Sequence, residues 1–348
     1  MAMTTLERAR RVTGGVDTHL DVHVAAVLDD IGGLLGVEPF AASRAGYGQL
    51  LQWMNSFGIP ARVGVEGTGA YGAGLARYLQ AAGVEVIEVD RPNRQARRHH
   101  GKSDPADAVE AARAAHNGRV QAVAKSRNGK VEAIRTLVVA KRSARQARIK
   151  ALNQIRHLSF TGPDELRARL AGLATARLAE QTAALRPRPG AEVVAYATRV
   201  ALRTLGRRIL ALDEELAALN ELLAELVAAA APQLLAVHGV GVDTAAALLV
   251  AAGDNPERLR SEAAWAHLCG VAPLQASSGK VIRHRLDRGG DRQANQALWR
   301  IVMVRMSTDD RTRAYVERRT KEGRSKREII RILKRYVARE VYRLLSRP

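Results

Sequence analysis

The 348-residue sequence has one cysteine, few aromatic residues and no long uncharged apolar run. The single Cys269 excludes a disulfide framework and a thiol-rich metal site, and we expect it to be a small core residue. No apolar stretch approaches the ~20 residues that a membrane-spanning helix needs. The N-terminal segment also lacks the apolar core of a signal peptide. These absences predict a cytoplasmic protein with no membrane partner.

Acidic residues are scarce relative to basic ones. The chain has 55 Lys and Arg against 35 Asp and Glu, a net charge of +20. The basic residues gather in segments 91–102, 125–150 and 311–348. Solvated helix faces are the simplest explanation of one such cluster, but three of them favour a polyanionic partner, and nucleic acid is the first candidate. Membrane-surface binding is disfavoured because the clusters lack the Trp- and Phe-rich faces of interfacial helices.

Four acidic residues stand where a metal-dependent nuclease would need them. Asp17 in GGVDTHLDVHVAAVLD and Glu66 in RVGVEGTG lie in apolar, strand-like segments, where a carboxylate is costly to bury unless it is paired or binds a cation. Asp104 and Asp107 in GKSDPADA are one turn apart on a predicted helix and share a face. Together they predict Mg²⁺ and a phosphate substrate. A helix start with Asp104 as its cap also explains SDPAD, but it does not explain Asp17 and Glu66.

The first third of the chain has the element order of an α/β domain. Strand-like segments fill residues 12–42, and a helix is predicted from 43 to 57. A strand (ARVGVEG), a helix (AYGAGLARYLQAAG) and a further strand (VEVIEVD) follow. Three strands and then alternating helix and strand predict a ribonuclease-H-like (RuvC-like) domain over residues 1–128. Ligands gather at strand ends in such a sheet.

Residues 129–230 are predicted to be helical. Residues 129–159 have the pattern of one long basic helix, and a later helix carries apolar residues at alternating steps of three and four. This seam comprises Leu202, Leu205, Ile209, Leu212, Leu216, Leu219, Leu223 and Leu226. Such spacing predicts a coiled coil, and with it a homo-oligomer, a dimer or a tetramer. The alternative is an amphipathic helix that packs within one subunit.

Residues 231–348 are predicted to form a mostly helical domain. LLAVHGVGVDTAAALL at 234–249 resembles a helix-hairpin-helix, in which Gly239 and Gly241 permit the tight turn. Their amides can then bind a DNA phosphate at the start of the next helix. The alternative is an ordinary turn between two helices.

A second informative stretch is GVAPLQASSGKVIRHRLDRGG, in which Ser277-Ser278-Gly279 precedes a run of cations. Those cations are Lys280, Arg283, Arg285 and Arg288. Nearby positive charge stabilises the charge that develops when a serine attacks a phosphate. From spacing alone, a polar turn followed by a basic strand is the better explanation.

The order of these pieces resembles the DEDD-type insertion-sequence transposases of the IS110 family, which include the Piv-like recombinases. The resemblance covers nearly the whole length through VD, VEGTG, KSDPADA, HGVG, GVAP and SSG. It implies that Asp17, Glu66, Asp104 and Asp107 hold Mg²⁺, expected as two ions. It also implies a serine nucleophile, for which Ser278 matches better than Ser277.

The resemblance further implies a DNA recombinase that excises and inserts a mobile element, guided by a structured non-coding bridge RNA. Its partners would then be DNA, RNA and further copies of the chain, in a bacterial cytoplasm near the nucleoid. Nucleic-acid contacts are expected at Arg97, Arg98, Lys102, Gly239, Gly241, Lys280, Arg283, Arg285 and Arg288. Two alternatives stay open: a Holliday-junction-type nuclease that uses metal-activated water, and a non-catalytic nucleic-acid-binding protein.

Overall fold

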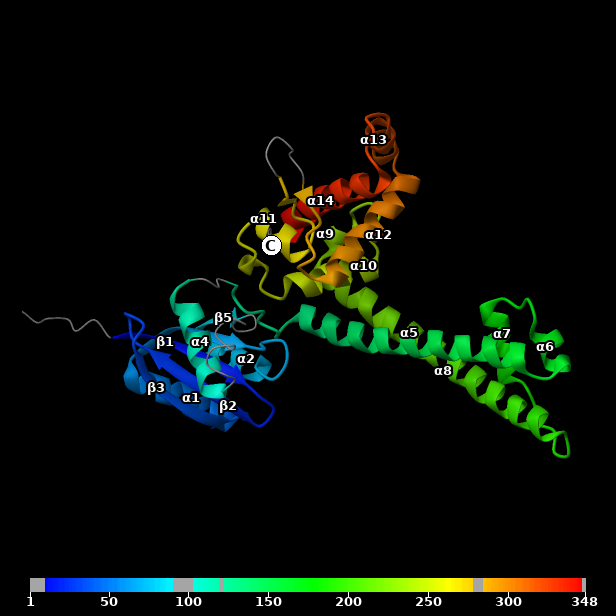
Figure 1. Cartoon of the computed structure of the whole chain (residues 1–348), viewed down its shortest axis with the longest axis horizontal. Helices are drawn as coiled ribbons and strands as arrows, with labels where there is room; N and C mark the ends of the chain where they lie inside the picture. The colour runs from blue at the N-terminus through cyan, green and yellow to red at the C-terminus, as the bar shows by residue number, and fades with distance from the viewer. Residues whose placement is uncertain (1–9, 90–102, 119–121, 278–283, 346–348) are drawn as a thin grey trace, which may run out of the picture. The chain divides into compact units, whose positions relative to one another are not determined.

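The computed structural model describes residues 10–89, 103–118, 122–277 and 284–345. This part of the chain forms two compact units (Figure 1). The first unit contains the chain up to residue 129 together with residues 252–265, and the second contains residues 130–251 and 266–347. The first unit is therefore not continuous in sequence.

A mixed five-stranded sheet forms the centre of the first unit, in the order β3-β2-β1-β4-β5. The strands are β1 (Arg11–Thr18), β2 (Val22–Leu28), β3 (Leu34–Ala41), β4 (Ile59–Glu66) and β5 (Glu85–Val89). The first three strands pair antiparallel, and β4 and β5 run parallel to β1. This is the expected order of three strands followed by alternating helix and strand. The connections from β3 through α1 (Arg44–Phe57) and from β4 through α2 (Ala73–Ala81) make the parallel pairings possible.

Two glycines in β1 let helices lie close to both faces of the sheet. A Cβ atom on Gly14 would come within 2.7 Å of Met54 Cε on α1, whereas one on Gly15 would overlap the backbone of α4 (Asp104–His116) at Ala112. Successive residues of a strand point to opposite faces. Helix α1 therefore covers one face of the sheet, and α4 lies directly on the other.

Residues 252–265 complete the edge of the first unit. Ala124 donates its N–H to the Val86 carbonyl at 2.9 Å, so the segment after α4 runs beside β5. Arg258 Nε then donates to the Val123 carbonyl at 2.8 Å, and its guanidinium lies 3.6 Å from the Glu88 carboxylate. The Asn255 side chain also bonds the backbone of Ala124. These contacts hold the later segment to the sheet.

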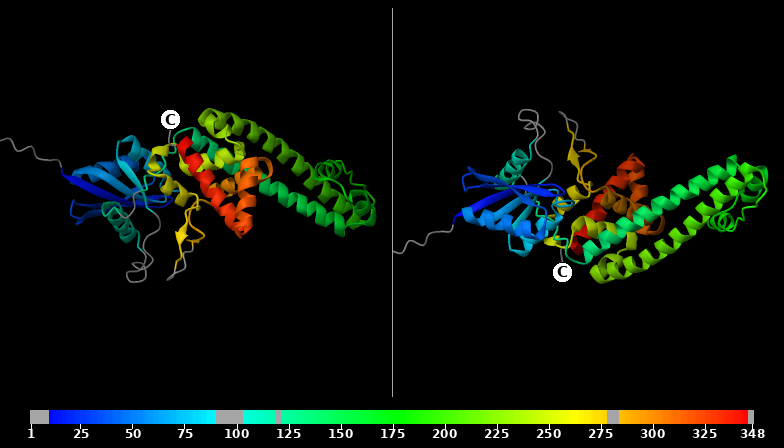
Figure 2. Two further views of the ribbon diagram at one scale, coloured as in Figure 1. Left: turned by 90° about the horizontal axis from the view of Figure 1, so that it is seen from above. Right: turned by 90° about the horizontal axis from the view of Figure 1, so that it is seen from below.

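A long helical hairpin begins the second unit. Helices α5 (Lys130–Thr161) and α8 (Val193–Ala230) lie side by side (Figures 1 and 2), and the short α6 (Asp164–Leu170) and α7 (Thr175–Ala183) connect them. An ion pair between Arg148 and Asp213 joins the two long helices. The predicted long basic helix is confirmed as α5.

The apolar seam of α8 is buried within the chain to a large extent. Leu202, Ile209 and Leu223 are fully buried, and the other seam positions are partly buried. Leu202 and Ile209 belong to a core cluster with residues of α5, α6 and α7. Helix α5 of the same chain thus provides a partner for the seam, as the alternative to self-association supposed. If the chain forms a homo-oligomer through α8, the contacts must therefore come from the residues of α8 that face solvent.

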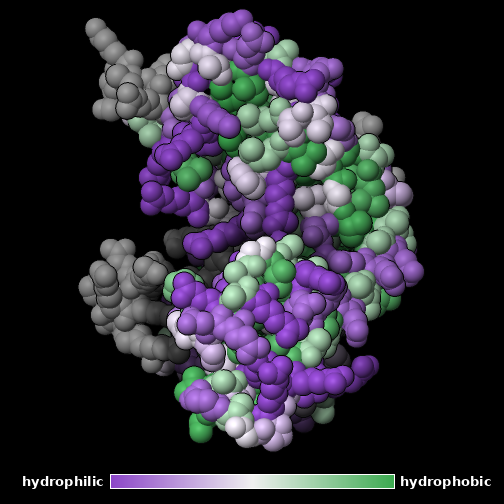
Figure 3. Space-filling model, turned by 90° about the vertical axis from the view of Figure 1, so that its right-hand side faces the viewer, coloured by the Kyte–Doolittle hydropathy of each residue, from purple (hydrophilic) through white to green (hydrophobic). Residues whose placement is uncertain are grey.

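The rest of the second unit is a helical domain with one small hairpin. Its elements are α9 (Pro232–Leu235), α10 (Val242–Ala252), α11 (Glu262–Leu268), β6 (Leu274–Gln275), β7 (His284–Arg285), α12 (Arg292–Thr308), α13 (Asp310–Lys321) and α14 (Lys326–Leu345), of which the first part of α11 belongs to the first unit. In the view of Figure 3, which shows the whole chain, hydrophilic and hydrophobic residues are interspersed. Of the helices that the structure describes, none combines the length and apolarity needed to cross a membrane.

Candidate metal centre

Asp17 and Glu66 lie on neighbouring strands at the same edge of the sheet. Gly15 pairs with Gly64 and Val16 with Val65, so the next pair in this parallel register is Asp17 and Glu66. Thr18 Oγ1 donates to the Glu66 carbonyl at 2.8 Å and joins the two strand ends. Both acids lie two residues after a glycine that faces α4, so by alternation their side chains are on the α4 side of the sheet.

Helix α4 brings Asp104 and Asp107 to this edge. Its direction is opposite to that of β1, because His116 near its C-terminus lies 3.4 Å from Thr13 Oγ1 near the start of the strand. Glycines at 15 and 64 permit this approach, since a Cβ on either would overlap the α4 backbone. Asp107 is only 5% exposed, while the Asp104 side chain is 48% exposed.

Ser103, and not Asp104, caps α4. The Ser103 hydroxyl accepts from the Ala106 N–H at 3.4 Å, and Asp104 is the first helical residue. The explanation of Asp104 as a cap is therefore wrong for this helix. Its carboxylate is free of a capping role, although it lies at the positive end of the helix dipole, where negative charge is favoured.

His19 connects the two acidic elements and was not predicted as a site residue. Its Nδ1 lies 3.7 Å from Asp17 Oδ2, and its Nε2 lies 3.8 Å from Asp104 Oδ1. One ligand atom from each of these three residues lies within 4.8 Å of the others. His19 directly follows the last residue of β1, Thr18, and strand periodicity therefore gives no signal for it in the sequence.

The donor set fits a divalent cation. Asp17 is 6% exposed and Asp107 is 5% exposed, so two of the four predicted carboxylates are withdrawn from water. Asp17 also lies in one group with His19 and Asp104. Carboxylate oxygens are the ligands that Mg²⁺ and Mn²⁺ prefer, and the His19 imidazole favours Mn²⁺ among the two. A bound cation would offset the electrostatic cost of gathering these carboxylates.

Several predicted nucleic-acid and catalytic residues lie outside the described part of the chain. They are Arg97, Arg98, Lys102, Ser278, Lys280 and Arg283. The residues that border the serine segment are described: Leu274 pairs with Arg285 and Gln275 with His284 in an antiparallel hairpin. Arg285, in this hairpin, and Arg288, after it, are both exposed.

The predicted glycine hairpin lies between α9 and α10. Gly239 has a φ of +82°, a conformation that favours glycine, and a Cβ there would come within 3.2 Å of the Ile301 carbonyl on α12. Gly241 is exposed, but its N–H donates to Thr244 Oγ1 at 2.9 Å. Helix α9 before this turn has only four residues. Of the two predicted amides, that of Gly241 therefore already has a partner within α10.

Two family models match this chain. One, described as "Transposase" and specific to the DEDD type, matches residues 14–160, and one described as "Transposase IS116/IS110/IS902 family" matches residues 231–317. The chain is also similar to the "Insertion element IS110 uncharacterized 43.6 kDa protein" of Streptomyces coelicolor, with 37% identity over 95 residues. That match covers 27% of this chain and 23% of the relative. Residues 14–160, which the first family model matches, contain all four predicted acids.

Proposed function

This chain belongs to the IS110 family of transposases, and we propose that it excises and inserts a mobile element by Mg²⁺-dependent strand cleavage with a serine nucleophile. The observation that carries the proposal is the placement of Asp17 and Glu66 on adjacent strand ends beneath the N-terminus of α4. The order of the strands and the position of α4 support a RuvC-like, ribonuclease-H-like domain.

The four carboxylates, with His19 beside them, would hold the cation. A divalent ion bound there supplies charge stabilisation to a phosphodiester under attack. Asp17 and Asp107 are the buried members, and they would hold the site in a fixed geometry. Asp104 is half-exposed and lies where a substrate can reach it. This division of roles follows from burial alone.

Ser278 is proposed to attack the phosphorus of the scissile phosphodiester. The new bond joins Ser278 Oγ to phosphorus, and the bond from phosphorus to one deoxyribose oxygen breaks. The serine proton passes through solvent to the departing oxygen. One phosphodiester is thus exchanged for another, so rejoining to a different DNA end needs no ATP. Arg285 and Arg288, with Lys280 and Arg283, are proposed to hold the backbone.

We also propose that a structured non-coding RNA guides the reaction and that the active form is a homo-oligomer. The net charge of +20 supports a second polyanion besides DNA. Apolar residues that face solvent on α8, among them Leu210 and Leu222, support self-association.

The test is a covalent adduct between protein and labelled DNA, analysed on a denaturing gel. Ser278→Ala should bind DNA and metal but form no adduct, whereas Ser277→Ala should keep substantial activity. Asp17→Asn and Asp107→Asn should abolish the adduct, while Asp21→Asn, a change at an exposed acid near the turn after β1, should not. An adduct that persists in Ser278→Ala and vanishes in Ser277→Ala would reassign the nucleophile.

A metal-activated water nuclease is the second candidate. It is favoured by the fact that the described metal centre is built wholly from the first unit. It predicts metal-dependent cleavage by both serine variants with no adduct in any sample. That result would replace the transposase mechanism with hydrolysis.

A further inference from the structure

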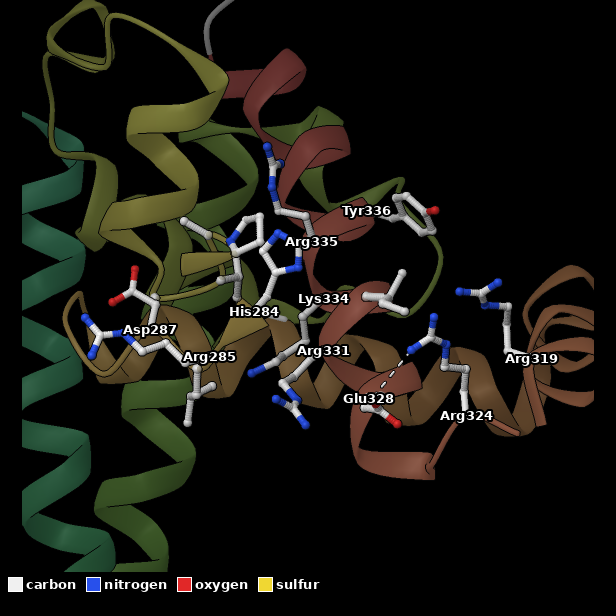
Figure 4. A pocket seen from close by; sticks show the side chains of 16 residues that line it. His284, Arg285, Asp287, Arg319, Arg324, Glu328, Arg331, Lys334, Arg335 and Tyr336 are labelled. Atoms are coloured by element: carbon white, nitrogen blue, oxygen red, sulfur yellow. Dashed lines mark ion pairs between the residues drawn. The ribbon is translucent and has the colours of Figure 1, made fainter. Parts of the chain in front are cut away.

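A basic pocket lies in the second unit beside α14. It has a volume of about 950 Å³ and is lined by the segment 270–273, by β7 and the residues after it, and by α13 and α14 (Figure 4). Its cations come from three segments of the chain. They are Arg285, Arg319, Arg324, Arg331, Lys334 and Arg335. We call it the α14 pocket.

The two acidic residues of the lining, Asp287 and Glu328, already have partners among the described residues. Glu328 lies 3.7 Å from Arg324, an ion pair drawn in Figure 4, and it also accepts hydrogen bonds from Ser325. Asp287 Oδ2 lies 3.4 Å from His267 Nδ1. The cations of the pocket therefore outnumber the acids that could neutralise them, and an anion is the missing complement.

Lys334 provides the strongest sign of a built site. Its side chain belongs to a residue only 7% exposed, and Nζ donates to Asn295 Oδ1 at 2.9 Å. Among the described residues, no carboxylate forms an ion pair with it. Burial, with the charge of Arg331 beside it, lowers the pKa of Lys334. A buried ammonium whose partner is a neutral amide is destabilising unless an anion joins it.

The orientation of Asn295 is set by the backbone below the pocket. Its Nδ2 donates to the carbonyls of Cys269 at 2.8 Å and Gly270 at 3.0 Å, so its oxygen faces Lys334. The same Gly270 leads along the pocket wall to β6, which pairs with β7. The position of the ammonium is thus fixed relative to the hairpin that borders the serine segment.

We infer that the α14 pocket binds a backbone phosphate of the DNA strand that the serine segment attacks, with Lys334 and Arg331 as its phosphate contacts. The pocket is open to a polymer because Arg285, Arg324 and Arg331 are exposed. A phosphate carries the charge that the lining lacks, and Arg and Lys are its usual ligands. We assign the phosphate to DNA because β7, which borders the serine segment, forms one wall of the pocket. This assignment rests on the proposed function.

The experiment combines protein variants with single neutral phosphates in the DNA. Affinity of the full chain for an end-labelled duplex is measured in EDTA, first with normal backbone and then with one methylphosphonate at each position in turn. The variants are Lys334→Met, which keeps an unbranched side chain but removes the ammonium group, and Arg331→Gln at an exposed position. Arg327→Gln is the matched control, since Arg327 is exposed on the same helix outside the pocket.

The expected result is a loss of about tenfold in affinity for Lys334→Met and Arg331→Gln, with a lower slope of log affinity against log salt, by about one per contact. One methylphosphonate position should weaken the wild type but cause no further loss in these two variants. Arg327→Gln should respond to that position as the wild type does. Circular dichroism checks that Lys334→Met is folded. If Lys334→Met does not fold, the test uses Arg331→Gln alone.

Equal affinities for wild type, Arg331→Gln and Arg327→Gln would overturn the inference. The DNA assignment would also be overturned if the variants lost affinity for an RNA hairpin but kept their affinity for the DNA duplex. Because binding is measured without divalent metal and without cleavage, a failed adduct assay leaves this result unaffected. Conversely, a negative binding result does not bear on Ser278 or the metal centre.

Discussion

The backbone of Ala112 occupies the space where a side chain on Gly15 would lie. A Cβ there would overlap the Ala112 amide and come within 2.5 Å of its Cα. This contact, with a similar one between Gly64 and the Ala111 carbonyl, holds α4 against β1 and β4. The distance of Asp104 and Asp107 from Asp17 therefore depends on two residues that have no side chain.

Gly15→Ala should displace α4 and disrupt the metal centre. The clash is with backbone, which cannot move aside as a flexible side chain can, so we expect a loss of stability of about 3 kcal/mol and no metal-dependent cleavage. Thermal unfolding and a cleavage assay measure the two effects. Gly48→Ala is the control, because its Cβ would meet only the Tyr78 hydroxyl, at 3.2 Å. Normal cleavage by Gly15→Ala would show that α4 does not position the site.

His19→Asn should weaken metal binding while leaving the fold intact. The imidazole lies within 4 Å of both Asp17 and Asp104, so it acts as a ligand or orients the carboxylates. Loss of such a group lowers metal affinity by about tenfold or more. Calorimetric titration with Mn²⁺ and Mg²⁺ measures the change. His267→Asn, at a histidine beside Asp287 in the other unit, should leave both affinities unaltered. The same insensitivity in His19→Asn would exclude His19 from the site.

Substitutions at neighbouring residues of α8 should affect folding and self-association separately. Ile209 is fully buried and Leu210 is 36% exposed. Ile209→Asn places a polar amide in the hairpin core and should destabilise the protein by about 3–5 kcal/mol. Leu210→Asn combined with Leu222→Asn should change stability by less than about 1 kcal/mol, yet lower the particle mass in light scattering. An unchanged mass would mean that oligomers do not form through this face.

Cys269 should be unreactive in the folded protein. Burial, with the negative charge of Asp291 as a lesser cause, raises the pKa of the thiol, so the reactive thiolate is depleted at neutral pH. An aromatic disulfide reagent should label it at the rate of unfolding and fully in denaturant. Stoichiometric labelling of the native chain within the mixing time would contradict the described packing around α11.

The sheet and its acids were predictable because strand alternation and helix periodicity are local. GGVD and VGVEG contain both the strand pattern and the glycines, and α1 begins within one residue of the expected position. Cys269 is buried as expected. The sequence offered Asp104 as the cap of α4, whereas the preceding residue, Ser103, is the cap. Serine and aspartate have similar capping preferences, so the sequence does not distinguish them.

Other features depend on contacts distant in sequence. A heptad seam specifies that a helix has an apolar partner, but the same leucines fit a helix of the same chain or of another chain. Here α5 supplies that partner. His19 has no periodic signal of its own, and its role emerges only when α4 is placed over β1. The attachment of Arg258 to β5 likewise has no local pattern.

The return of residues 252–265 to the sheet sets an order of events during synthesis. Asn255 and Arg258 cannot reach Ala124 and Val123 until the helical hairpin between them has left the ribosome. The hydrogen bond between Asn255 and Ala124 joins residues 131 positions apart in the sequence, and contacts at such a separation form slowly during folding. The sheet edge of the first unit is therefore finished late, and a nascent or truncated chain that ends at residue 129 lacks it. Newly made protein would acquire its complete first unit only once most of the second has been translated.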